Sequence, residues 1–422
     1  MKPALLLLTG TRSPTATRMA LALVQQGCRV DVLCPVGHSA LQVPGLGRCW
    51  HFAMRDSLDS LRHVLGSGRG YRMILPCDDA VVAQLIVLHE QVPALRGLIE
   101  QSIGPVSCHE ALLQRHRLLM AARSLGLDVP EHRHLDSAQD LLFWFREGHG
   151  RSVLKRDLSP GEARVQVVND LSEAERAWAG FSRPVSASGL LRGMLVERDP
   201  MVWWSRRHPG RTRLLVQRFV EGRPASTLVL CEQGRLLACL SLAAVETLGS
   251  TGPAVTVHRI RHPGMEAAAR QLSAHLHLTG LHSLGFVLEQ GSGRPCLIDL
   301  NPHCSPTTHL AWADQPSLAA LLAARLRGHP PLPVRHPLGQ DRVSLFPQVP
   351  LGQALGEHDV PGGQPVLVQA MADRPWPQRL WSHRLHARLH PSRPVERIRY
   401  DDEMSSGRWE DPPVDPEPSS AT

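Results

Sequence analysis

Short apolar segments separated by helical stretches occupy the first hundred residues. Ala4 to Thr9 and Arg29 to Cys34 are apolar segments of strand length, and Ser13 and Pro14 begin a helical stretch between them. Met73 to Leu75 gives a third apolar segment. This order of strand, helix and strand predicts a small parallel α/β domain.

After residue 108 the pattern changes to helices mixed with hairpins. A helix is predicted from Glu110 to Leu125, and a strand from Ser152 to Lys155. From Leu214 onward apolar runs joined by tight Gly-containing turns predict antiparallel strands, and the hairpin that ends with Cys296 to Asn301 is one of them. Helices followed by hairpins are typical of an α+β arrangement.

The division of the chain follows from these patterns. A length of 422 residues is too great for one compact core, and the acidic, Pro- and Ser-rich end of the chain has little to bury. The predicted parts are an α/β domain at 1–108, two α+β lobes at 109–210 and 211–330, a C-terminal extension at 331–400 and a disordered tail at 401–422.

Composition then restricts the cellular setting. Gly10, Thr11 and Arg12 interrupt the opening apolar run before it reaches the length of a signal segment. No later stretch approaches the roughly 20 apolar residues that span a bilayer. The nine cysteines are odd in number and never form a CxxC pair, which is typical of reduced thiols. We therefore expect a soluble cytoplasmic protein with no membrane partner.

The basic residues are almost all arginine. The net charge is +7, but the arginines are spread along the chain and aromatic residues make up only 4%, so we expect no nucleic-acid partner. Of the 46 Lys and Arg residues, only Lys2 and Lys155 are lysine. A lysine is a compact charge whereas arginine is a planar fork, so the retention of Lys155 favours a functional role at a crowded anionic site.

The hairpin strand that ends in Asp299-Leu300-Asn301 carries the sharpest chemical signal. Residues two apart in a strand face the same side, so Asp299 and Asn301 present a carboxylate and an amide oxygen together. Hard oxygen donors in this arrangement suit Mg²⁺ that is bound together with nucleotide phosphates. A strand that simply ends in a turn capped by Asn301 remains the alternative.

The segment resembles the metal-binding strand of ATP-grasp enzymes. The usual form of that strand has Glu at the position of Asp299 and Arg at the position of His303. Lys155 lies at the right distance upstream to match the strand lysine that contacts nucleotide phosphates in this family. The resemblance implies an α/β domain followed by a two-lobed ATP-grasp domain, with Lys155 and His303 in catalytic roles and Mg²⁺ on Asp299 and Asn301.

Further positions match the nucleotide site of the family. Arg115 stands where the family has a second phosphate-contacting cation, with Arg117 as a near competitor. The segment that contains Gln217, Phe219 and Val220 resembles the hinge strand whose backbone reads the adenine edge. The resemblance therefore assigns these three residues, Arg115 and Lys155 to ATP binding. A buried strand followed by a Gly turn is the alternative for the hinge.

Two departures from the family pattern concern the metal and the phosphates. Gly285 occupies the position of the first metal ligand, which is normally acidic or Gln. Glu289 is four residues farther, about 13 Å along a strand, and cannot replace it without a change of register. The second nucleotide loop is normally Gly-rich, but the matching segment 159–164 has a single Gly.

The resemblance implies an ATP-dependent ligase. Such an enzyme transfers the γ-phosphoryl group of ATP to a carboxylate, and an amine then attacks the acylphosphate. We therefore expect ATP and Mg²⁺ as cofactors and small-molecule carboxylate and amine substrates, and a homodimer stays open. The alternative is a non-catalytic ATP-grasp protein that binds nucleotide at a degenerate metal site.

Overall fold

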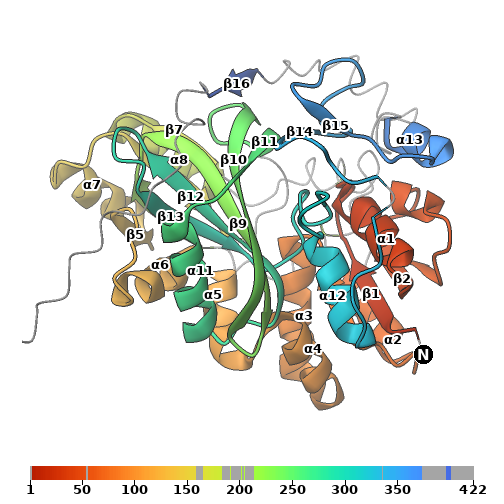
Figure 1. Cartoon of the computed structure of the whole chain (residues 1–422). Helices are drawn as coiled ribbons and strands as arrows, with labels where there is room; N and C mark the ends of the chain where they lie inside the picture. The colour runs from red at the N-terminus through yellow and green to blue at the C-terminus, as the bar shows by residue number, and fades with distance from the viewer. Residues whose placement is uncertain are drawn as a thin grey trace, which may run out of the picture.

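The computed structural model describes most of the chain (Figure 1). Residues 2–372 are described except for 54–55, 158–164, 335 and the stretch 183–212, of which only Leu191, Met201 and Trp204 are described, and residues 396–400 complete the set. The predicted second nucleotide loop at 159–164 and the predicted tail at 401–422 lie outside these residues.

The strands and helices from β1 to α4 form a parallel sheet between two layers of helices, which confirms the predicted parallel α/β arrangement. The strand order is β3-β2-β1-β4, and every pair is parallel. Side chains of β1 alternate, since Leu5 and Leu7 pack with α1 while Leu6 and Leu8 pack with α2 and α3. The elements are β1 (Ala4–Leu8), α1 (Thr15–Gln25), β2 (Arg29–Cys34), β3 (Cys49–His51), α2 (Ser57–Leu65), β4 (Met73–Pro76), α3 (Asp79–Gln91) and α4 (Arg96–Ile103).

A small antiparallel sheet follows, in the order β5-β8-β6-β7. One face of this sheet packs Leu154 and Val216 against α7 and α8, with Trp144 at the centre of a separate apolar core. The opposite face carries Lys155 and Gln217, because their neighbours in the strands point to the helices. The elements are β5 (His132–Leu135), α7 (Ala138–Arg146), β6 (Ser152–Arg156), β7 (Val165–Val168), α8 (Leu171–Ser182) and β8 (Leu214–Arg218).

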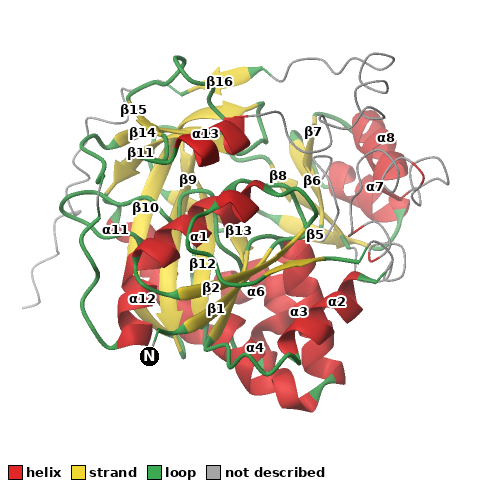
Figure 2. Ribbon diagram, turned by 90° about the vertical axis from the view of Figure 1, so that its right-hand side faces the viewer, coloured by secondary structure: helices red, strands yellow, loops and turns green. Residues whose placement is uncertain are grey.

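A larger sheet forms the centre of the molecule (Figures 1 and 2). Its strand order is β13-β12-β9-β10-β11-β14-β15, and β16 pairs with β10. Strands of residues 342–399 thus extend the same sheet. The elements are β9 (Gly222–Glu232), β10 (Arg235–Leu248), β11 (Ala254–Ile260), α11 (Pro263–His275), β12 (Gly280–Glu289), β13 (Pro295–Asn301), α12 (Leu318–Arg327), β14 (Arg342–Leu345), β15 (Glu357–Asp359), α13 (Pro365–Ala372) and β16 (Arg397–Arg399).

The single helix predicted over Glu110 to Leu125 is wrong. The structure has α5 (His109–Leu113) and α6 (Arg115–Ser124), and Gln114 between them is extended with φ −124° and ψ 110°. The break starts a new helix at Arg115. The side chain of this first helical residue reaches Asp157 and Asp299. Local periodicity could not show the break, because both helices keep an apolar face.

Two further observations bear on the setting of the protein. No helix in the described part of the chain is long and apolar enough to span a membrane. All nine cysteines are free thiols, as the sequence predicted.

The core of the small sheet gives a stability prediction. Leu141 of α7 is fully buried, whereas Phe143, two residues along the same helix, is 51% exposed. Truncation of a buried leucine to alanine costs its transfer free energy and leaves a cavity, so Leu141→Ala should lower the free energy of unfolding by about 2–5 kcal/mol. Phe143→Ala, the matched control, should change it by about 0.5 kcal/mol or less. Urea unfolding would measure both, and equal losses would contradict the assigned helix orientation.

Candidate nucleotide and metal site

The two residues with the most specific sequence signals meet between the small and the large sheet. Lys155 lies on β6 and is only 5% exposed. Its Nζ donates a hydrogen bond to the backbone carbonyl of Ile298 on β13 at 3.2 Å. Asp299 is the next residue of β13, so Lys155 and Asp299 belong to one site, which is the placement that the sequence predicted.

Arg115 connects the two sheets at this site. Its Nη1 donates to Oδ1 of Asp157 at 2.8 Å, and its Nη2 donates to Oδ2 of Asp299 at 3.0 Å. These three residues and Asp79 of α3 line a small cavity of about 20 Å³. Arg117, the competing candidate, is instead exposed and pairs with Glu110 at 3.5 Å.

Burial and charge act on each of these groups. Burial lowers the pKa of Lys155 to about 8, with Asp299 opposing and Arg115 reinforcing the effect. Burial would also lower the pKa of Arg115, but the carboxylates of Asp299 and Asp157 more than offset it, so that pKa is raised. Burial raises the pKa of Asp157, which is 2% exposed, although Arg115 opposes the shift. Two cations and two carboxylates therefore balance one another in this site.

The metal-ligand positions lie at the end of β13. Asp299 accepts a hydrogen bond at Oδ1 from the backbone N–H of Leu300 at 2.9 Å. The side chain of Asn301, two residues farther on the same face, makes no hydrogen bond within the described part of the chain. No three His, Cys, Asp or Glu side chains among the described residues are grouped to hold a metal ion. The end of β13 thus offers one carboxylate and one amide oxygen, and a Mg²⁺ held there would need phosphates and water as its other ligands.

The register of β12 and β13 explains the departure at Gly285. Gly285 pairs directly with Asp299, so an acidic residue at this position would stand beside the Asp299 carboxylate. A Cβ added at Gly285 would meet the Cβ of Asp299 at 3.4 Å, which is an ordinary contact. Glu289 bonds instead to Ser292 and Arg294 at the far end of the hairpin. The structure therefore leaves room for the missing carboxylate but does not supply it.

The hinge residues join the small sheet to the large one. Gln217 lies near the end of β8, and Phe219 and Val220 form the connection to β9. Gln217 is 3% exposed, and its Oε1 has no hydrogen-bond partner in the described part of the chain. The guanidinium of Arg151 lies 4.0 Å from the centre of the Phe219 ring. A buried amide oxygen without a donor is costly unless a ligand satisfies it.

His303 pairs with Asp79, a contact that the sequence analysis missed. Its Nε2 lies 3.2 Å from Oδ1 of Asp79, and its Nδ1 donates to the carbonyl of Cys304 at 3.0 Å. Burial alone would lower the pKa of His303, but the hydrogen bond and charge of Asp79 outweigh it and raise that pKa from 6.5 to about 9. His303 is therefore a cation at neutral pH, like the arginine that the family usually has at this position.

Asp157 is the other residue that sequence reasoning missed. It is the first residue after β6 and lies two residues after Lys155. This short spacing was the signal for it in the sequence, because side chains two apart along an extended chain face the same side. The partner of Asp157 could not be found this way, because Arg115 reaches it only after the break before α6.

His309, in the loop after β13, is held by protein groups at one nitrogen. Its Nε2 lies 2.8 Å from Oδ2 of Asp359 and 2.9 Å from Nε of Arg18. The side chain is 7% exposed. These contacts attach the loop after β13 to α1 and to β15.

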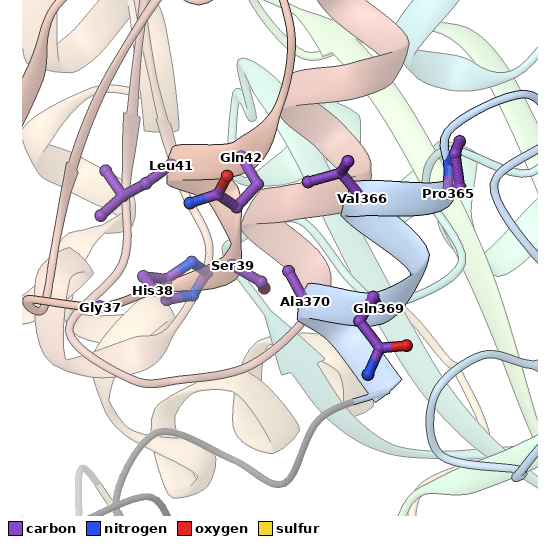
Figure 3. Close-up of a pocket in the computed structure, with 9 residues that line it drawn as sticks. All are labelled: Gly37, His38, Ser39, Leu41, Gln42, Pro365, Val366, Gln369 and Ala370. Carbon is purple, nitrogen blue, oxygen red and sulfur yellow. The ribbon is translucent and has the colours of Figure 1, made fainter.

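Two larger cavities lie away from these residues. One of about 590 Å³ lies between residues 37–42 and α13 (Figure 3). Among the described residues that line it, none is charged at neutral pH, because burial lowers the pKa of His38 to about 4. The other, of about 880 Å³, lies between α4, the β9–β10 turn and α12. Neither contains Lys155, Arg115 or Asp299, so the paired charges remain the best candidate for a phosphate site.

Comparison with known proteins supports the fold that the sequence predicted. A scan against protein-family models and a search of curated proteins gave no match. Among solved structures, the biotin carboxylase domain of Hydrogenobacter thermophilus 2-oxoglutarate carboxylase matches with a TM-score of 0.55 at 12% identity, over 80% of this chain and 71% of that one.

Two further solved structures show the same likeness. L-amino acid ligase from Bacillus licheniformis matches with a TM-score of 0.52 at 14% identity, over 81% of this chain and 78% of that one. N5-carboxyaminoimidazole synthase from Aspergillus clavatus matches with a TM-score of 0.53 at 12% identity, over 73% and 72%. The chain therefore has the ATP-grasp fold that the sequence predicted, with an α/β domain at its N-terminus.

The His303–Asp79 pair predicts a pH-dependent stability. The pKa of His303 is higher in the folded than in the unfolded protein, so its stabilisation is complete below pH 6.5 and is lost as the pH rises through about 9. The shift corresponds to roughly 3 kcal/mol. Asp79→Asn should remove most of this dependence. The measurement is urea unfolding of both proteins at pH 6.5 and 9.5.

The comparison with Asp79→Asn is needed because Lys155 acts in the opposite direction. Its pKa is lowered on folding to about 8, so stability from this group rises with pH above that value. Both proteins contain Lys155, and the difference between their pH profiles isolates His303. Identical profiles would show that Asp79 does not hold the charge of His303.

Proposed function

We propose that the protein is an ATP-dependent ligase that activates a carboxylate as an acylphosphate for attack by an amine. The observation that carries this proposal is the meeting of Lys155 and Arg115 with Asp299 between the small and the large sheet. Two buried cations opposite a carboxylate and an amide oxygen form a site of the right charge for nucleotide phosphates with a divalent ion.

The base of the nucleotide fits the hinge. The Oε1 of Gln217, which has no partner among the described residues, is an acceptor, and the adenine amino group is a donor of matching kind. Phe219 and Val220 follow at once in the chain and supply apolar surface beside it. Position 225, where the family carries a ribose-binding Glu, is Ala225, so this chain lacks that contact.

The reaction places a defined demand on each residue. A carboxylate oxygen attacks the γ-phosphorus, the bond to the β–γ bridging oxygen breaks, and ADP leaves; the amine then attacks the acyl carbon and phosphate leaves. Lys155 and Arg115 would neutralise phosphate oxygens, and the His303 cation would stabilise the charge that develops. Mg²⁺, when bound, would supply further charge neutralisation, with Asp299 and Asn301 as its protein ligands.

The structural neighbours support the reaction class. One bears the name L-amino acid ligase, and the biotin carboxylase domain was solved with MgADP and bicarbonate. The synthase from Aspergillus clavatus was solved with ADP and 5-aminoimidazole ribonucleotide. These names indicate the class of substrate, a carboxylate or bicarbonate with an amine, and no particular compound for this chain.

A second candidate function rests on Gly285. The position opposite Asp299 lacks a carboxylate, and Arg115 already pairs with Asp299. Both features favour a protein that binds nucleotide without turnover. We rank this second because a single Mg²⁺ with few protein ligands remains chemically adequate.

Nucleotide binding is tested first through Lys155. MgATP at about 100 times its dissociation constant should raise the free energy of unfolding by roughly 2.7 kcal/mol, since only the folded state binds it. Lys155→Ala should abolish most of this gain. Lys155→Arg should also lose much of it, because the guanidinium fork does not replace a compact charge in a buried site. Thermal or chemical unfolding with and without MgATP gives the values. No gain in the wild type at millimolar MgATP would exclude the proposed site.

Turnover is tested by capture of the acylphosphate with hydroxylamine across a panel of carboxylates. Wild type should give a slow signal that Asp299→Ala abolishes. Gly285→Asp restores a carboxylate in contact with Asp299 and should raise the apparent Mg²⁺ affinity, by about tenfold if the added ligand contributes about 1.4 kcal/mol. Bound ATP without turnover on any acceptor would favour the second candidate function.

A further inference from the structure

The charges at the site are arranged so that each expected ligand meets a competitor: Arg115 competes with a divalent cation for Asp299, and the carboxylates of Asp157 and Asp299 compete with a phosphate for Arg115. Its guanidinium occupies Asp299, which a divalent cation would use. The same guanidinium is hydrogen-bonded to Asp157 and Asp299. A phosphate that binds Arg115 must compete with both carboxylates. A cation alone therefore meets a carboxylate that is already neutralised, and a phosphate alone meets an arginine that is already paired.

Asp157 contributes to this arrangement without lying at a metal position on β13. It is 2% exposed, its Oδ1 accepts from Arg115 at 2.8 Å, and it is the first residue after β6 of the small sheet, whereas Asp299 lies on β13 of the large sheet. Removal of its charge would leave Arg115 with one anionic partner in place of two. The side chain of Asp157 thus fixes the position of the guanidinium that a phosphate would use.

We propose that Asp157 is a positioning residue that holds Arg115 on Asp299 in the free protein, so that nucleotide and divalent cation bind with strong positive coupling. A phosphate draws Arg115 away and frees Asp299 for the cation. The cation in turn takes the charge of Asp299 and frees Arg115 for the phosphate. Each ligand removes the competitor of the other, and the coupling is reciprocal by thermodynamic necessity. This inference rests on the proposed nucleotide site.

The experiment measures ADP binding by calorimetry, in EDTA and in Mg²⁺, for the wild type and Asp157→Asn. The asparagine keeps an oxygen for Arg115 and removes only the charge. Wild type should bind ADP at least about tenfold more tightly with Mg²⁺ than without it. In Asp157→Asn the affinity in EDTA should rise by about five- to tenfold, while the affinity in Mg²⁺ should stay within about threefold of the wild type.

Three further variants separate the possible causes. Asp157→Glu retains the charge and should behave like the wild type in EDTA. Asp299→Asn should also bind ADP more tightly in EDTA, but Mg²⁺ should add little, because a metal ligand is lost. Asp59→Asn removes the same charge from an exposed side chain of α2 and should change nothing.

Each outcome decides between the claims. Unchanged or weaker binding of Asp157→Asn in EDTA would overturn this inference and leave the nucleotide site intact. Loss of the Mg²⁺ effect in Asp157→Asn would make Asp157 a metal ligand and would also overturn it. Failure of the wild type to bind ADP even with Mg²⁺ would reject the proposed function itself. If Asp157→Asn fails to fold, tighter binding by Asp157→Glu in EDTA would still contradict the proposal.

Discussion

The pairing of Arg115 with two carboxylates from different sheets is the constraint on which the site depends. Asp157 and Lys155 are nearly inaccessible to water, and a buried charge without a partner costs several kcal/mol. Arg115 satisfies Asp157 from the small sheet and Asp299 from the large sheet at once. One guanidinium therefore connects the start of α6 with carboxylates near both sheets.

Much of the fold could be predicted because strand alternation and caps are local signals. The parallel sheet of the first 108 residues and the strands that carry Lys155 and Asp299 formed where the apolar runs predicted them. The break before α6 was not predictable, because Gln114 is compatible with a helix and leaves it only in the folded chain. Periodicity shows which face of a helix is buried. The break at Gln114 changes the direction of the helix axis but keeps the apolar face buried, so periodicity does not detect it.

Only those features of the site that residue types and spacing reveal could be predicted from the sequence. The signals for Lys155 and Asp299 came from rarity and from alternation, and both residues lie together in the structure. Asp157, the partner of Arg115, and Asp79, the partner of His303, were missed, since long-range ion pairs leave no trace in a single sequence. The raised pKa of His303 depends mainly on such a partner, Asp79. The roles of these residues toward ATP and Mg²⁺ remain a proposal.

The distribution of the apolar cores explains why ion pairs and hydrogen bonds matter for the contact between the small sheet and β13. The small sheet packs Leu154, Val216 and Trp144 in a core of its own, while the parallel sheet and the large sheet share their cores. Apolar burial therefore unites the parallel sheet with the large sheet but contributes less between the small sheet and β13. At that boundary the bonds of Arg115 and the contact of Lys155 with Ile298 connect the two sheets. A ligand that bound Arg115 or Lys155 would replace these hydrogen bonds with bonds to itself. Its binding would therefore also change the connection between the two sheets.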